Sequence, residues 1–150
     1  MIIHKDLKDL FQLLAENNVD YIIVGGYAVA FHGFIRATKD VDILFRNTPE
    51  NIDRLITAIA QFGISPEALD QNTFSEQGRI VRIGSPPMMV EFINSVSGIT
   101  FAEAWEHRVE GIYGDVEVFF ISRSDLLKNK IASGRPQDLR DVDELGHSDN

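Results

Sequence analysis

The sequence predicts an α+β fold in a single domain that ends in a pair of helices. The chain has 150 residues, 44% of them hydrophobic and 25% charged, which suits one domain with its own core. Short β-branched or aromatic runs, bounded by glycine or proline, alternate with segments of helical periodicity. We expect one domain over residues 1–150, with a core at about 20–121 and C-terminal helices at about 124–146.

The first third of the chain predicts the order helix, strand, short helix, strand. The apolar stripe of the opening helix consists of Leu7, Leu10, Phe11 and Leu14. The run YIIV, Tyr21–Val24, predicts a buried strand that stops at two glycines. Residues 27–32 suit a short helix, and DVDILF, Asp40–Phe45, predicts the second strand.

The next helix has a clear start and a clear end. Thr48 supplies a capping hydroxyl, Pro49 fits the first turn, and Glu50 complements the helix dipole. Its inner stripe consists of Ile52, Leu55, Ile56 and Ile59. Gly63 ends it, and the polar segment 65–78 is expected to be a loop.

The second half predicts two strands in a hairpin, a helix, a strand and the closing helices. RIVRI and MMVEFI flank a turn at residues 84–87, and VEVFFI begins a further strand at Val116. The helix between them is indicated by Phe101, Ala104 and Trp105. The closing helices carry Leu126, Leu127 and Ile131, then Leu139, Val142 and Leu145, with Gly134 and Pro136 between them.

Composition excludes several functions. A formal net charge of −9 disfavours stable binding to duplex DNA, which needs many phosphates neutralised at once, although a small groove for a tRNA end stays open. No cysteine is present, which excludes thiol catalysis and thiolate zinc sites, and the four histidines lack zinc-ligand spacing. The N-terminus shows no signal peptide, and no apolar run approaches the roughly 20 residues of a membrane span, so we expect a cytoplasmic protein without membrane contact.

Two aspartates lie on the second predicted strand. Asp40 and Asp42 project from one face, with their carboxylates about 7 Å apart or closer, while Val41 and Ile43 take the other face. Two like charges at that distance need a compensating cation, and Mg²⁺ held by carboxylates and substrate phosphates is the simplest one. Glu91, the single acid in MMVEFI, is the candidate third carboxylate. The alternative is a turn at Asp40 and a solvent-facing Asp42.

Gly25 and Gly26 follow a strand and precede a short helix. Such a turn lets the backbone approach a phosphate closely and offer N–H groups to it, although it also suits a simple tight connection. The Walker A and dinucleotide-binding fingerprints are both absent.

The stretch GGYAVAFHGFIRATKDVDILF resembles the signature of DNA polymerase beta-type nucleotidyltransferases. More narrowly, GGYAV, HG and RATKDVDI are similar to the small bacterial group related to AbiEii-type toxin nucleotidyltransferases. LLKNKIASGRPQDLRDVDEL also resembles the closing helix pair of that group, so the resemblance covers about residues 21–145. It implies a nucleotidyltransferase fold with a mixed central sheet flanked by helices.

The resemblance also implies roles for individual residues. It makes Asp40, Asp42 and Glu91 the catalytic metal ligands, for Mg²⁺ or Mn²⁺, and it assigns the nucleotide phosphates to Gly25 and Gly26. Many relatives have serine directly after the first glycine. This chain has Gly26 and then Tyr27, so phosphate contacts in this turn would rest on the backbone. Glutamate in place of the usual aspartate makes the third acid longer by one methylene.

Tyr27, beside the two glycines, is a candidate for nucleotide binding, and so are three further residues. Arg36 suits a phosphate or one of the acids, or else braces the strand edge. Thr38 is in register with Asp40 and either donates to a carboxylate or favours the strand. Lys130 would neutralise the leaving pyrophosphate, or else is a cation on a helix face.

Two functions follow as hypotheses. The first is a metal-dependent nucleotidyltransferase that moves an NMP from an NTP to an acceptor, which is RNA such as a tRNA end, a partner protein or a small molecule, with a toxin–antitoxin component as one case. The second is an NTP-binding or regulatory module of the same fold with little turnover.

Overall fold

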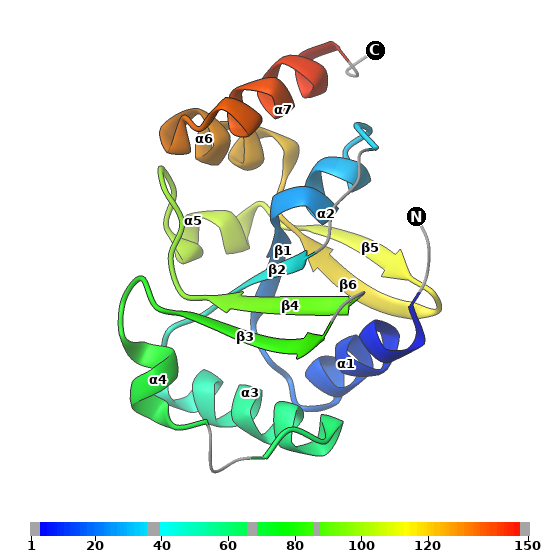
Figure 1. Cartoon of the computed structure of the whole chain (residues 1–150), viewed down its shortest axis with the longest axis vertical. Helices are drawn as coiled ribbons and strands as arrows, with labels where there is room; N and C mark the ends of the chain where they lie inside the picture. The colour runs from blue at the N-terminus through cyan, green and yellow to red at the C-terminus, as the bar shows by residue number, and fades with distance from the viewer. Residues whose placement is uncertain (1–3, 36–39, 66–68, 86–87, 148–150) are drawn as a thin grey trace.

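The computed structural model describes residues 4–35, 40–65, 69–85 and 88–147. Within them the chain forms, in order, α1 Lys5–Glu16, β1 Tyr21–Val24, α2 Gly25–Phe31, β2 Asp40–Phe45, α3 Pro49–Phe62, α4 Gln71–Ser75, β3 Ile80–Ser85, β4 Met88–Ile93, α5 Phe101–Glu106, β5 Val109–Tyr113, β6 Val116–Phe120, α6 Arg123–Ser133 and α7 Pro136–His147. Helices cover both sides of one central sheet, and the two C-terminal helices follow each other (Figure 1). The prediction of an α+β single domain is confirmed.

The sheet is mixed, as predicted. Its strand order is β3-β4-β2-β1-β6-β5. The pairs β2–β4 and β1–β6 are parallel, whereas β1–β2, β3–β4 and β5–β6 are antiparallel. This order puts the two strands that carry the predicted acids, β2 and β4, side by side near the middle of the sheet.

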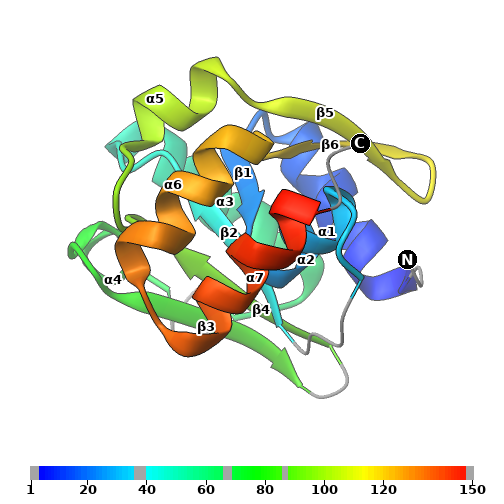
Figure 2. The same cartoon turned by 90° about the horizontal axis from the view of Figure 1, so that it is seen from above.

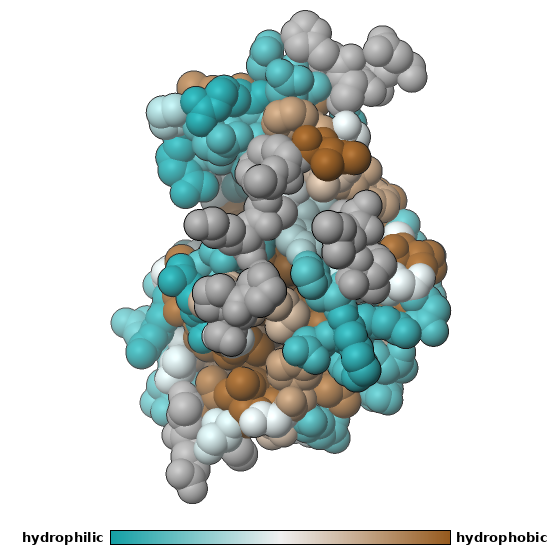
Figure 3. Space-filling model, turned by 45° about the vertical axis from the view of Figure 1, so that its right-hand side comes forward, coloured by the Kyte–Doolittle hydropathy of each residue, from teal (hydrophilic) through white to brown (hydrophobic). Residues whose placement is uncertain are grey.

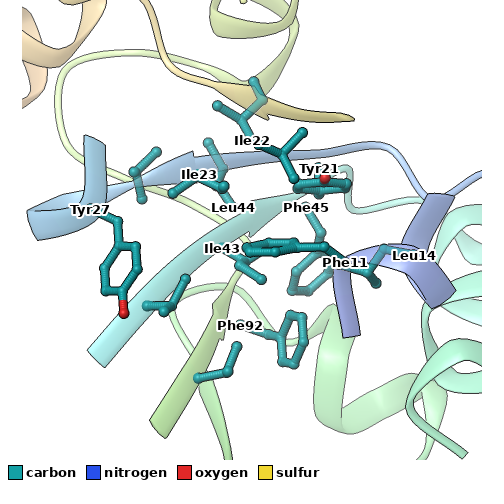
Figure 4. Close-up of a cluster of buried hydrophobic side chains, with 14 of the residues drawn as sticks. Phe11, Leu14, Tyr21, Ile22, Ile23, Tyr27, Ile43, Leu44, Phe45 and Phe92 are labelled. Atoms are coloured by element: carbon teal, nitrogen blue, oxygen red, sulfur yellow. The ribbon is translucent and has the colours of Figure 1, made fainter. Parts of the chain in front are cut away.

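One face of the sheet packs on α1 and α3 and forms the main core. The apolar stripes of both helices are buried there, together with the residues of β2 and β4 that alternate away from the acids. Aromatic rings join the layers: Phe11 stacks on Tyr21 with ring centroids 6.1 Å apart (Figure 4). Phe74 makes T-shaped ring contacts with Phe45 and Phe92. Burial of this face fixes the register of the strands, because a one-residue slip would exchange core and acid positions.

The other face of the sheet carries α2 and the helix pair α6–α7. Viewed from above, α6 and α7 lie over the sheet and α2 lies beside α7 (Figure 2). The predicted helix signals are present: Thr48 accepts a hydrogen bond from the Asn51 backbone, and Gly134 ends α6 with a left-handed φ of 68°. The helix pair therefore lies over the same face of the sheet from which the acids project.

Three sequence expectations were wrong in detail. The short helix begins at Gly25, not at residue 27, so the glycines form its first turn. The polar segment 65–78 contains α4, a short helix capped by Asp70, whose carboxylate accepts from the Thr73 backbone. Strand β5 was not predicted, because Gly111 and the charged residues around it obscure its alternation. No helix in the described part of the chain is long and apolar enough to cross a membrane.

Candidate functional site

A pocket of about 740 Å³ opens where β1 ends, between the sheet and the helix pair. We call its two sides the sheet wall, formed by the β1–α2 turn, β2 and β4, and the helix wall, formed by α6 and the start of α7. The predicted residues among its lining are Gly25, Gly26, Asp40, Asp42, Glu91 and Lys130. The surface of the helix pair, at the top of the view, is mainly hydrophilic (Figure 3).

The strand register creates a row of charged side chains across the sheet. Asp42 of β2 is paired with Glu91 of β4, and Glu91 is paired with Arg82 of β3. Residues directly opposite each other on neighbouring strands share a face, so these three side chains meet on the pocket side. Asp40, two residues before Asp42, projects from the same face. The prediction that Asp40 and Asp42 share one face is confirmed.

The glycine turn approaches Asp42 so closely that no side chain would fit. Gly25 has a φ of +67°, and a Cβ placed on it would lie 2.2 Å from Asp42 Oδ2. Only glycine meets both conditions without strain. The turn also provides backbone N–H groups at the start of α2, where no side chain caps the helix.

Asp42 is the most perturbed carboxylate of the sheet wall. Burial raises its pKa, and the charge of Glu91, a hydrogen bond between the two carboxyl groups and the charge of Asp40 raise it further, to about 7. Lys130 opposes the shift. Among the described residues, Asp42 Oδ1 is buried and has no hydrogen-bond partner. The alternative of a solvent-facing Asp42 is therefore wrong.

Glu91 is held by an arginine that sequence reasoning did not single out. Arg82 Nε donates to Glu91 Oε1 at 3.0 Å, and Arg82 Nη2 donates to the same oxygen. Within the described residues, no three acidic or histidine side chains are already grouped to hold a metal ion. The repeated arginines of RIVRI and the hairpin turn would have been the signal for this pair, since together they place Arg82 opposite Glu91.

The helix wall contains a buried and internally neutralised charge cluster. Lys130 Nζ lies 3.1 Å from Asp138 Oδ1 and 3.2 Å from Asp141 Oδ2, and all three side chains are almost fully buried. Arg135 Nε, at the exposed rim, donates to Asp138 Oδ2 at 2.8 Å. Lys130 lies in the last turn of α6, where a cation also suits the helix dipole, and it lines the pocket, so its role toward the pyrophosphate stays a prediction.

The remaining predicted residues differ in their placement. Tyr27 is buried in the core and is not part of the pocket lining, so its side chain does not join the predicted set (Figure 4). Arg36 and Thr38 lie outside the described residues. The ring of His32 forms a hydrogen bond of 2.7 Å with the Ile121 carbonyl, and burial lowers its pKa.

Solved structures with this fold include an antigenic nucleotidyltransferase-like protein from Paracoccidioides brasiliensis, with a TM-score of 0.57 and 19% identity, over 96% of this chain and 77% of that one. The antibiotic-resistance factor ANT(2'')-Ia gives a TM-score of 0.60 at 15% identity, over 95% and 82%. The lincosamide antibiotic adenylyltransferase LnuA, bound to lincomycin, gives 0.57 at 17%, over 97% of each chain. At these identities the likeness establishes the fold.

Sequence comparison supplies the family. Among curated protein sequences, none is similar enough to count as a relative. A family model described as "Nucleotidyltransferase of unknown function (DUF6036)" matches residues 2–149, which is nearly the whole chain. The resemblance to DNA polymerase beta-type nucleotidyltransferases is thereby confirmed, while the narrower relation to AbiEii-type toxins stays a prediction. The chain belongs to the DUF6036 family of nucleotidyltransferases.

Proposed function

We propose that this nucleotidyltransferase is metal-dependent and transfers an NMP from an NTP to the hydroxyl group of an acceptor. One observation carries the proposal: in the part of the chain that the structure describes, a buried carboxylate oxygen, Asp42 Oδ1, has no hydrogen-bond partner, and it belongs to a cluster of acids that faces the pocket. An unpaired buried carboxylate is costly, and a site that binds a cation makes use of it.

The donor set fits a hard divalent cation. Mg²⁺ and Mn²⁺ prefer carboxylate oxygens and substrate phosphates as ligands, and Asp40, Asp42 and Glu91 bring such oxygens to one face of the sheet. These three side chains would hold the ion. When bound, it would neutralise charge on the phosphates and polarise the α-phosphoryl group toward attack.

The protein's own groups would position the nucleotide. The backbone N–H groups of the turn at Gly25 and Gly26 are available to phosphate oxygens, since no Cβ and no capping side chain obstructs them. On the opposite wall, Lys130 would oppose the charge that develops on the pyrophosphate. Ile80 and Ile93, paired across β3 and β4 in the pocket lining, offer an apolar surface for the base or the acceptor.

For the acceptor we propose a small molecule that carries a hydroxyl group. Two structures with this fold are complexes that contain an antibiotic: ANT(2'')-Ia with adenylyl-2''-tobramycin, and LnuA with lincomycin. The net charge of −9 gives the surface little affinity for long nucleic acids. Transfer to a tRNA end, which would fit a toxin, and transfer to a protein side chain are the competing outcomes.

The test is a transfer assay with each NTP labelled at the α-phosphate and with Mg²⁺ or Mn²⁺. It uses a panel of hydroxyl-bearing antibiotics, total tRNA and the protein itself as acceptors. We expect transfer to a small molecule and a loss of at least about 10³-fold in Asp42→Asn. Asp115→Asn, an exposed site far from the pocket, is the matched control. Metal-dependent NTP binding without transfer to any acceptor would instead identify an NTP-binding module.

A further inference from the structure

Arg82 is a charged residue of the acid row to which neither the family nor the proposed function gives a role. It lies on β3, the edge strand of the sheet, and its side chain is 57% exposed. Its partner Glu91 is 15% exposed. The arginine can therefore move into solvent, whereas the glutamate is fixed between strands.

The contact between them occupies one oxygen of the third predicted metal ligand. Both N–H groups of Arg82 reach Oε1 of Glu91, on the side away from β2. The hydrogen bond and the charge of Glu91 raise the pKa of the guanidinium, and the charges of Asp40 and Asp42 add to this shift. The hydrogen bonds to Glu91 make Arg82 a counter-ion of the acid row on the β3 side, whereas Lys130 acts on Asp42 from the helix wall.

The same contact limits what Glu91 can offer to a metal ion. An oxygen that accepts two hydrogen bonds from a guanidinium has little capacity left for an inner-sphere metal bond, and a guanidinium beside the site repels an incoming cation. Oε1 of Glu91 therefore serves either Arg82 or the metal ion.

Resting on the proposed metal-dependent function, we propose that Arg82 is an internal counter-ion that competes with the catalytic cation for Glu91. Binding of the cation displaces Arg82 from Oε1. The released guanidinium then stands beside the bound nucleotide, with a geometry that suits phosphate oxygens. Arg82 is on this view a positioning residue, which keeps the acid row stable in the empty protein and makes cation entry depend on exchange of one positive charge for another.

The test measures Mn²⁺ binding to the full chain by calorimetry, without nucleotide, in the wild-type protein, Arg82→Gln and Arg82→Lys. We expect Arg82→Gln to bind Mn²⁺ about fivefold more tightly, about 1 kcal/mol, because the pair it removes is partly exposed. Arg82→Lys should lie between the two, since lysine keeps the charge and loses the paired donors. Arg54→Gln, an exposed site on α3, controls for net charge and should bind like the wild type.

A second readout separates competition from a general structural role. In EDTA, Arg82→Gln should unfold at a lower temperature than the wild-type protein, because the acids lose their counter-ion, yet it should gain more stability from Mn²⁺. If Arg82 had a purely structural role, Arg82→Gln would lower both the unfolding temperature in EDTA and the stabilisation by Mn²⁺. That result, or an unchanged Mn²⁺ affinity, overturns the proposal. If Mn²⁺ binding is lost in Asp42→Asn but unaffected by Arg82→Gln, only the role of Arg82 fails. If the wild-type protein binds no Mn²⁺, the proposed metal site fails with it.

Discussion

The two walls of the pocket treat buried charge in opposite ways. On the helix wall, Lys130 lies between Asp138 and Asp141, so that each charge has a partner of opposite sign. On the sheet wall, acids face acids: Asp42 lies beside Glu91 and Asp40, and the pKa of Asp42 is raised to about 7 by burial and by these neighbours. Arg82 compensates this row only from its exposed edge.

The difference indicates which wall is suited to bind a ligand. A buried charge persists when it is paired within the protein or when function requires it unpaired. The helix wall satisfies the first condition, and the proposed cation site would make Asp42 of the sheet wall an example of the second. Substitutions in the helix wall should therefore lower the stability of the empty protein, whereas removing an acid from the sheet wall should lower ligand binding and spare stability.

The largest effect should follow from removing the central cation of the helix wall. Lys130→Met removes the buried cation that Asp138 and Asp141 share, and we expect the free energy of unfolding to fall by about 3–5 kcal/mol in urea denaturation. Lys128→Met, an exposed position in the same helix, should change it by no more than about 0.5 kcal/mol. Adding Asp138→Asn and Asp141→Asn to Lys130→Met should restore part of the loss. A loss below about 1 kcal/mol in the single variant would mean that the cluster is not a structural unit.

Next in size is the contact between the glycine turn and the acid row. Gly25→Ala puts a Cβ in the left-handed region and against Asp42 Oδ2, so we expect a loss of about 2–3 kcal/mol in unfolding free energy together with weaker cation binding. The control is Gly63→Ala. Gly63 has a φ of +110°, and no atom lies within 4 Å of an added Cβ, so this variant measures the backbone strain alone, which we expect to cost about 1 kcal/mol. Equal losses of unfolding free energy in the two variants would show that the close contact with Asp42 adds nothing to the backbone strain at Gly25.

Acid should weaken the helix wall through Asp138. Burial alone would raise the pKa of this carboxyl from 3.8, but hydrogen bonds from Arg135, Ser133 and Lys130 outweigh it and lower the pKa to about 2. A depressed pKa contributes stability that is complete above the unfolded value and is lost as the pH falls toward the folded one. The stability gap between wild type and Asp138→Asn should therefore narrow by about 1 kcal/mol from pH 5 to pH 3. If the stability difference between the wild-type protein and Asp138→Asn stays constant from pH 5 to pH 3, Asp138 is not the group whose protonation weakens the helix wall.

The smallest effect should come from the exposed rim of the same wall. The side chain of Arg135 is 76% exposed, and ion pairs of this kind contribute little because water and salt screen them. Arg135→Gln should change the unfolding free energy by less than about 1 kcal/mol. A loss comparable to that of Lys130→Met would mean that the helix wall is not organised around its buried cation.

The sequence alone predicted which acids lie on the sheet wall. Alternation from Asp40 to Ile43 put the two aspartates on one face, and the lone acid in MMVEFI singled out Glu91; the pairing of β2 with β4 in the structure then places Asp42 beside Glu91. The two glycines predicted the turn correctly, because the positive φ of Gly25 and its closeness to Asp42 leave no room for a side chain. The glycine turn is a local signal, and the shared face of the aspartates follows from the two-residue period of a strand. Both can be recognised without knowledge of the tertiary structure.

The rest depended on contacts between elements that no local pattern encodes. The burial of Lys130 between two acids requires the packing of α6 on α7, and a lysine with these neighbours in sequence looks the same on a solvated face. Arg82 required the hairpin register, which the turn at residues 84–87 could have supplied. Short α4 and strand β5 were missed because polar residues and a glycine weaken their periodicity.

The central claim, that the sheet wall gives up stability in order to bind a cation, is tested most directly by thermal and urea unfolding of Asp42→Asn with EDTA or with Mn²⁺. In EDTA the variant should be about 1 kcal/mol more stable than the wild-type protein, since it removes a buried like charge. The stabilisation by Mn²⁺ that we expect in the wild-type protein and in Asp115→Asn should be absent from it. A variant that is less stable in EDTA, or that keeps the full Mn²⁺ effect, would contradict the account.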